Sequence, residues 1–284
     1  MTSNLIPGVA VNLANHIVLP TDLPGALPET LPIVEYAMGH VFHRVFTESL
    51  DEEGIRQYEA NEFNDYSRLF LSGGLLQRKL TVGHSGECAY QRMQVHRFSP
   101  IIADPATYSE RIVPAIYAGT SFNAALSETI FRQHDRVKPK PINRHHLINR
   151  YGVQLITNQK IKLCVLTEPY LSEGSEAVFP FSEHEVIQCA ATAEGYRRCH
   201  EIASAIYHHP DKVDGLFWQS RHMDNTFNLV LWSRGRKYSV SPFDLLQYRH
   251  QTTEEPLFEG PGLRKVYNEA ARLHIPAARL RTWL

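Results

Sequence analysis

The sequence predicts an α+β domain in which a mixed or antiparallel sheet is flanked by helices. Short apolar runs bounded by polar or turn residues are typical of strands, and several occur between residues 86 and 250. The run from Phe227 to Trp232 is almost wholly apolar, which predicts a strand buried at the centre of the sheet. Between these runs, amphipathic segments that begin with capping residues predict helices.

Five segments carry the strand pattern. In chain order they are residues 90–98, 115–119, 161–166, 213–218 and 227–232. The longer intervals between them leave room for helices, as an α+β domain requires.

Capping residues mark where the helices begin. Ser121 is expected to cap a helix whose apolar residues recur at helical spacing, namely Phe122, Ala125, Leu126, Thr129 and Ile130. Ser182 and Glu185 form an S-x-x-E capping box, which predicts the start of a long helix that ends at His209 and Pro210. The tail, residues 261–284, is expected to contain one or two further helices, opened by Pro261 and Pro276.

The N-terminal third of the chain has a different pattern. Residues 1–32 are rich in proline and predict an irregular leader. A helix is expected after them, because five apolar residues fall on one helical face: Val34, Met38, Val41, Phe42 and Val45. A second helix is expected over residues 51–71. We therefore divide the chain into a leader with a helical extension (1–85), an α+β body (86–250) and a helical tail that packs on the body (251–284).

The charge balance argues against a sequence-independent grip on nucleic acid. The chain has 29 Lys and Arg and 30 Asp and Glu, a net charge of −1. Residues 1–86 hold 5 of the basic and 10 of the acidic residues, so the remainder carries 24 against 20. A mildly basic body suits an anionic substrate.

Several familiar site patterns are missing from the sequence. The four cysteines form no CxxC pair, and there is no HExxH motif, so we expect no metal centre. There is no phosphate loop of the GxxxxGK[ST] type and no GxGxxG motif. No secretory signal or membrane span is recognisable, because Pro and Asn interrupt the apolar run at the N-terminus. A cytoplasmic location is therefore expected.

Four scattered residues are the candidates for chemistry: Arg97, Tyr117, Glu128 and Ser220. An arginine offers a fork of donors to a phosphate, a tyrosine a ring face, a glutamate a fixed negative charge and a serine a small hydrogen-bonding group. Glu128 falls away from the apolar stripe of its helix, so it points either to solvent or into a cleft. The alternatives are a salt-bridging arginine, a core or rim tyrosine and a turn-forming serine.

The order and contexts of these residues resemble the RES-domain family, named for its Arg, Glu and Ser. The segment YAGTSFNAALSETI resembles the family's Tyr-to-Glu region, and VDGLFWQSRH with FNLVLW resembles its Ser region. The resemblance covers about residues 90–235 and implies a fold like that of ADP-ribosyltransferases. The family's second arginine, in a Gly-Arg-Trp-Asn-like stretch, has no clear match, and Arg111 is the arginine available between Arg97 and Tyr117.

The resemblance implies an enzyme that degrades NAD as its substrate. Glu128 would stabilise positive charge on the ribose, Arg97 would hold the pyrophosphate, Tyr117 would bound the nicotinamide ribose and Ser220 would orient the nicotinamide. Water as the acceptor gives a NAD glycohydrolase, phosphate a phosphorylase, and a protein side chain an ADP-ribosyltransferase. A non-catalytic interaction module is the alternative from another class. The resemblance also implies an antitoxin or immunity protein and self-association.

Overall fold

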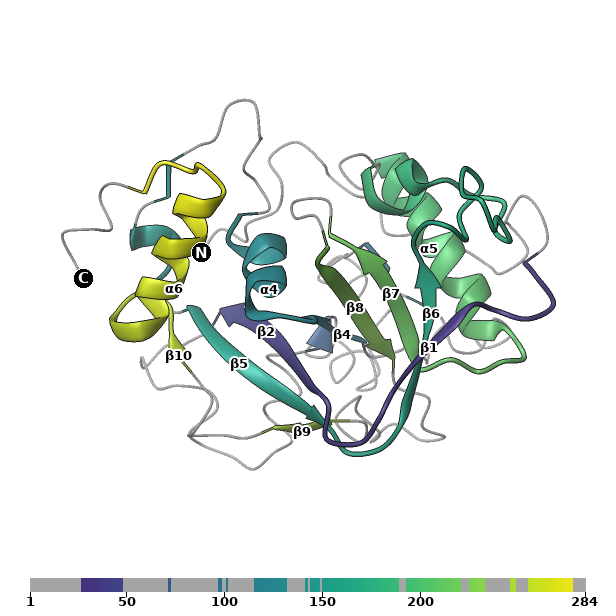
Figure 1. Ribbon diagram of the computed structural model, residues 1–284, viewed down its shortest axis with the longest axis horizontal. Helices are drawn as coiled ribbons and strands as arrows, with labels where there is room; N and C mark the ends of the chain where they lie inside the picture. The colour runs from purple at the N-terminus through teal and green to yellow at the C-terminus, as the bar shows by residue number, and fades with distance from the viewer. Residues whose placement is uncertain are drawn as a thin grey trace, which may run out of the picture.

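The strands that the structure describes form one mixed sheet of ten strands, and the described helices pack against it (Figure 1). The computed structural model describes residues 27–47, 71–72, 97–98, 101, 115–131, 141–142, 144–148, 150–188, 193–220, 225–232, 246–248 and 255–277. The strands of this sheet are β1 (Ile33–Tyr36), β2 (Val41–Thr47), β3 (Leu71–Ser72), β4 (Ala115–Gly119), β5 (Arg150–Thr157), β6 (Ile161–Leu166), β7 (Gly215–Gln219), β8 (Phe227–Trp232), β9 (Leu246–Tyr248) and β10 (Glu255–Pro256).

The order of the strands across the sheet is β1-β6-β7-β8-β4-β2-β5-β10, and β3 and β9 add to β4 and β5. The pair β6–β7 is parallel, and the other pairs are antiparallel. A parallel pair needs a long crossover, and the chain between β6 and β7 contains helix α5 (Ala193–His208). The predicted mixed sheet with flanking helices is therefore confirmed.

Strand β8 lies at the centre of the sheet, between β7 and β4. Five of its six residues are buried. Its alternate residues divide between two clusters: Val230 and Trp232 pack with the α5 side of the core, whereas Leu229 and Leu231 pack on the opposite face. The prediction of a central, nearly all-apolar strand is confirmed. The strands expected at 115–119 and 161–166 also have the expected bounds, and the one expected at 213–218 begins two residues later.

The helix expected from Val34 to Val45 is wrong, because this segment forms strands β1 and β2. Gly39 has a φ of 88°, and the turn around it reverses the chain between the two strands. Met38 lies in this turn and is 72% exposed, so it belongs to no apolar helix face. Strand β2 pairs with β5 along its whole length, and this non-local pairing overrides the local helical spacing.

Residues of the predicted extension therefore belong to the same sheet as the body. The helix expected at 51–71 lies outside the described residues except for Leu71, which is in strand β3. The strand expected at 90–98 is described only at Arg97 and Phe98, which form a turn.

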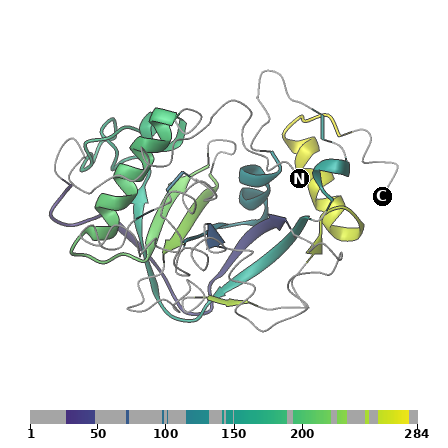
Figure 2. The same ribbon diagram turned by 180° about the vertical axis from the view of Figure 1, so that it is seen from behind.

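The described α-helices are distributed across the sheet, from one end of the strand order to the other. Helix α5 lies beside β6 and β7 at one end, α6 (Gly260–Arg272) beside β10 at the other, and α4 (Phe122–Thr129) between them (Figures 1 and 2). The hydroxyl of Ser121 accepts a hydrogen bond from the amide of Ala124 at 3.1 Å, which confirms the predicted cap of α4. Pro261 stands in the first turn of α6, as expected. None of the described helices is long and apolar enough to cross a membrane.

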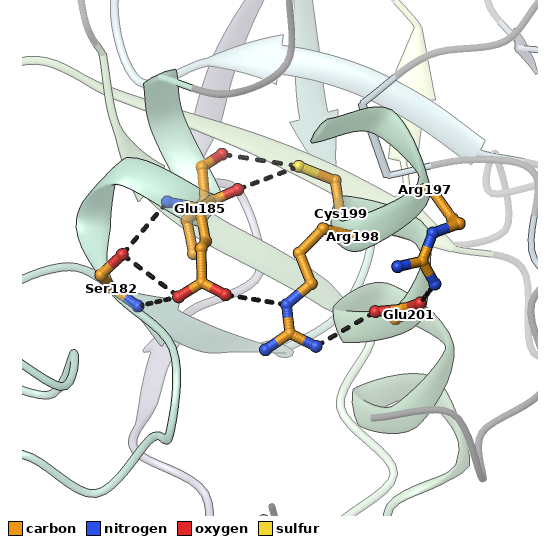
Figure 3. Close-up of polar contacts among 7 residues, drawn as sticks. Ser182, Glu185, Arg197, Arg198, Cys199 and Glu201 are labelled. Atoms are coloured by element: carbon orange, nitrogen blue, oxygen red, sulfur yellow. Dashed lines mark hydrogen bonds and ion pairs between the residues drawn. The ribbon is translucent and has the colours of Figure 1, made fainter. Parts of the chain in front are cut away.

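The capping box at Ser182 is confirmed, although the single helix expected after it is divided. The Ser182 amide donates to Glu185 Oε2 at 2.7 Å, and the Glu185 amide donates to Ser182 Oγ at 3.3 Å. Residues His184–Gln188 then form a π-helical turn, and residues 189–192 are outside the described part. Arg198 of α5 binds Glu185 at 2.9 Å and the buried Glu201 at 3.1 Å, so it ties this turn to α5 (Figure 3).

Candidate functional site

The candidate site lies where the sheet opens between β2 and β4. Among the described residues these two strands pair only through His43 and Gly119, whereas β2 continues along β5 and β4 continues along β8. Helix α4 follows β4 directly and packs against β2, β4 and β8. Gly119 makes this close approach possible, because a Cβ there would lie 2.7 Å from the backbone nitrogen of Ala125.

A cavity of about 160 Å³ occupies this opening. A protein cavity of roughly 150 Å³ can bind benzene, so this cavity has room for at least one ring-sized part of a ligand. Its polar and aromatic lining comes from Arg44, Arg97, Tyr117, Glu128, Trp218 and Asn228. The structure therefore brings together three of the four sequence candidates, from a turn, a strand and a helix.

Glu128 lines the cavity from α4, the second of the two orientations left open by the sequence. Its Oε1 accepts a hydrogen bond from Asn228 Nδ2 at 3.1 Å and lies at 3.5 Å from the hydroxyl of Ser220. No described residue forms a hydrogen bond with the other carboxylate oxygen, Oε2. One oxygen thus fixes the side chain, and the second remains available for a ligand.

Ser220 joins the site through Glu128. It follows β7 and is only 5% exposed, and its amide donates to the carbonyl of Thr226 at 2.8 Å, which closes the connection to β8. The serine is therefore a buried group that contacts the carboxylate of Glu128, as well as a turn residue.

Tyr117 positions the turn that carries Arg97. Its hydroxyl accepts a hydrogen bond from the amide of Phe98 at 2.9 Å. Its ring packs edge-on against Trp218, with 6.2 Å between the ring centroids. The tyrosine thus forms one wall of the cavity and holds the neighbouring turn in place.

Arg97 is buried beside aromatic rings. Its side chain is 5% exposed, and its guanidinium carbon lies 5.8 Å from the centroid of the Trp218 ring. Nη1 has no hydrogen-bond partner among the described residues. Because a buried cationic donor without a partner is costly, its position in the cavity favours an anionic ligand.

Arg44 is a cavity residue that sequence reasoning missed. It comes from β2, and its Nη1 donates to the carbonyl oxygen of Tyr117 at 2.5 Å. Burial lowers the pKa of Arg44 to about 10, so the guanidinium is still charged at neutral pH. The signal that could have identified it is an arginine between two apolar pairs in the short segment VFHRVF, whose length fits a strand. Arg111, the sequence candidate for a second arginine, lies outside the described residues.

Asn228 is the second cavity residue that sequence reasoning missed. It is a polar residue inside the apolar strand β8 and is 2% exposed. A buried amide in such a strand usually marks a specific hydrogen bond, which here goes to Glu128.

Among the described residues, no three His, Cys, Asp or Glu side chains gather as metal ligands.

Comparison with known proteins identifies one family. The family model of the RES domain matches residues 85–246, which is more than half of the chain. The crystal structure of the M. tuberculosis MbcT–MbcA toxin–antitoxin complex is similar at 12% sequence identity, covering 76% of this chain and 84% of that chain, with a TM-score of 0.39. No curated protein matches the sequence.

Proposed function

The chain belongs to the RES-domain family, and on this premise we propose that it degrades NAD by hydrolysis, releasing nicotinamide and ADP-ribose. Proteins of this family are toxin-like and act on NAD. The observation that carries the proposal is the carboxylate of Glu128, which is held through one oxygen in a cavity that also contains two arginines.

The reaction needs electrostatic stabilisation more than proton transfer. The bond between the nicotinamide nitrogen and the ribose carbon breaks, and its electron pair neutralises the pyridinium, so nicotinamide leaves as a neutral molecule. Positive charge then develops on the ribose, as in glycoside cleavage. Glu128 is placed to stabilise this charge in the transition state. Water forms the new bond to the ribose carbon and loses a proton to the solvent.

The other cavity residues bind and orient the substrate in this proposal. Arg44 and Arg97 supply donors for the pyrophosphate, and Arg97 retains a buried donor for it. Tyr117 bounds the nicotinamide ribose, and Ser220 orients the nicotinamide end beside Glu128. Arg44 supplies a second cation in this proposal, and Arg111, the sequence candidate for that role, lies outside the described residues.

The experiment that tests the proposal is proton NMR of NAD incubated with the purified protein. Free nicotinamide and ADP-ribose are expected with the wild type. Glu128→Gln keeps the shape of the side chain but removes its charge, so its rate should fall about 10²–10³-fold. Glu173→Gln, at an exposed glutamate, is the matched control and should keep the wild-type rate.

The same experiment identifies the acceptor. Phosphorylated ADP-ribose, formed only when phosphate is present, would make the protein a phosphorylase. If NAD remains intact until a protein substrate is added and is then consumed, the protein is an ADP-ribosyltransferase. Intact NAD in every sample would leave a non-catalytic interaction module. Near-normal turnover by Glu128→Gln would contradict the role of the carboxylate.

We further propose that a protein partner of the antitoxin type covers this cavity. A chain that consumes NAD should arrest the growth of the cells that express it alone, and Glu128→Gln should relieve the arrest. If the wild type and Glu128→Gln both arrest growth, the arrest does not result from NAD cleavage. Light scattering of the purified chain tests the expected self-association.

A further inference from the structure

Asn228 belongs to the central strand of the sheet and also lines the cavity. In strand β8 it is paired with Gly119 of β4 on one side and with Trp218 of β7 on the other. Its neighbours in the strand are apolar, and the amide side chain is almost completely buried. A polar side chain at such a position is unfavourable unless its hydrogen-bonding groups are used.

Only one half of this carboxamide is used in the described structure. Nδ2 donates to Glu128 Oε1 at 3.1 Å. A carboxylate can only accept, so this contact fixes the orientation of the amide, with its NH2 group toward Glu128. The carbonyl oxygen Oδ1 is buried and has no hydrogen-bond partner among the described residues. Asn228 is also one of the residues that line the cavity, so the unused acceptor belongs to a residue of the site.

Two unused acceptors therefore belong to residues that line the cavity. One is Asn228 Oδ1, and the other is Glu128 Oε2, which forms no hydrogen bond with the described residues. The arginines and Trp218 supply only donors, so these two oxygens suit a ligand group that donates. A vicinal diol offers two donors on adjacent carbons. The ribose whose glycosidic bond is cleaved carries such a diol, and its 2′-hydroxyl is on the carbon next to the reacting carbon.

We propose that Asn228 is a positioning and specificity residue that acts in two ways. Its NH2 group holds Glu128 in the orientation that stabilises the ribose cation, and its carbonyl oxygen accepts a hydrogen bond from a hydroxyl of that ribose. This inference rests on the proposed NAD cleavage. It assigns the substrate class more narrowly, to nucleotides whose reacting sugar retains its hydroxyls.

A double-mutant cycle tests the positioning role. We would measure kcat and KM of nicotinamide release for the wild type, Asn228→Leu, Glu128→Gln and the double variant. A hydrogen bond to a charged group corresponds to about 10–100-fold, which is the expected loss of kcat in Asn228→Leu. In the Glu128→Gln background the same change should cost less than about 3-fold. Losses that multiply would overturn the positioning role. Asn123→Leu, at an exposed residue of α4, is the control.

A substrate analogue tests the acceptor role. NAD that lacks the 2′-hydroxyl on its nicotinamide ribose differs in intrinsic reactivity, but this difference cancels when the ratio of kcat/KM for the two substrates is compared between variants. The ratio in favour of NAD should fall about 10-fold or more in Asn228→Leu relative to the wild type. An unchanged ratio would overturn the acceptor role. Asn228→Val, which also removes the acceptor and suits a strand, replaces Asn228→Leu if the latter does not fold.

Failure of the proposed function is recognised separately. If the wild type releases no nicotinamide, NAD cleavage is wrong, and the assignment of Asn228 is then measured by binding. ADP-ribose should raise the melting temperature of the wild type and raise that of Asn228→Leu by less. An equal rise in both would overturn the assignment, since the amide would then make no contribution to holding the nucleotide.

Discussion

Arg44 crosses the opening between β2 and β4 to donate a hydrogen bond from Nη1 to the carbonyl oxygen of Tyr117, at 2.5 Å. The two strands pair through a single residue pair, His43 and Gly119. Beyond that pair the edges of the strands separate. The arginine supplies a donor across this gap, and the guanidinium is thereby placed inside the cavity. The gap between the two strands therefore forms the cavity and also places the Arg44 guanidinium in it.

Replacement of Arg44 by lysine should weaken the binding of NAD. Lysine keeps the charge but lacks the planar fork that can donate to Tyr117 and to a phosphate together. We expect KM to rise about 10–100-fold, as for the loss of one charge-assisted hydrogen bond, with a smaller change of kcat. Arg264→Lys, at an exposed arginine of α6, is the matched control. An unchanged KM in Arg44→Lys would exclude Arg44 from substrate binding.

Arg97 should respond to an anionic ligand. Its buried Nη1 has no partner among the described residues, so a phosphate that reaches it gains a charge-assisted bond. ADP-ribose at about 100 times its dissociation constant should stabilise the protein by about 2.7 kcal/mol, which a thermal melt detects. Arg97→Gln should lose most of this rise at the same ligand concentration. A full rise in Arg97→Gln would show that the anion binds elsewhere.

Gly119→Ala should separate α4 from the sheet. The added methyl would lie 2.7 Å from the backbone nitrogen of Ala125 and 2.8 Å from the Cβ of Ala124, and backbone atoms cannot yield as a flexible side chain can. Helix α4 must then move, and Glu128 moves with it away from Asn228. A displacement of about 1 Å can cost about 10²-fold in rate, which we expect for kcat. A folded Gly119→Ala variant with wild-type kcat would contradict this coupling.

The parts that the sequence predicted correctly are those specified by neighbouring residues. The apolar runs of β4, β6 and β8 are bounded by turn residues, and Ser121 and Ser182 cap through side chains that reach only a few residues along the chain. The same local reasoning placed Glu128 away from the apolar stripe of α4. These patterns are short in range, so a single sequence is enough to read them.

The parts that were missed depend on pairing between distant segments. The spacing of Val34, Val41 and Val45 fits a helix as well as two strands, and only the pairing of β2 with β5 decides between them. A helix over this segment would not place Arg44 beside β4, so the sequence did not identify Arg44 as a site residue. Asn228 was overlooked for a related reason, since its partner Glu128 is 100 residues away in the chain. Such contacts are properties of the sheet topology.

The contact between Ser182 and Glu185 predicts a pH-dependent stability far from the site. Burial alone would raise the pKa of Glu185, but the amide of Ser182 and the guanidinium of Arg198 lower it, and the net pKa is below the ordinary value of 4.5. A carboxylate with a lowered pKa in the folded state contributes stability above the unfolded pKa. That contribution disappears as the pH falls through the folded pKa.

Glu185→Gln should therefore destabilise the protein at pH 7 but not in strong acid. Glutamine can still accept from the Ser182 amide, so the loss is that of the ion pair with Arg198, which costs up to about 1 kcal/mol, or up to about 4 °C in melting temperature for a chain of this size. The difference between wild type and Glu185→Gln should be full at pH 6–7, above 4.5, and should shrink as the pH falls below that value. Urea unfolding at a series of pH values measures it, with Glu173→Gln as the exposed control. A difference that stays constant down to about pH 2 would mean that the ionised carboxylate is not what stabilises this turn, because both forms would then do so equally.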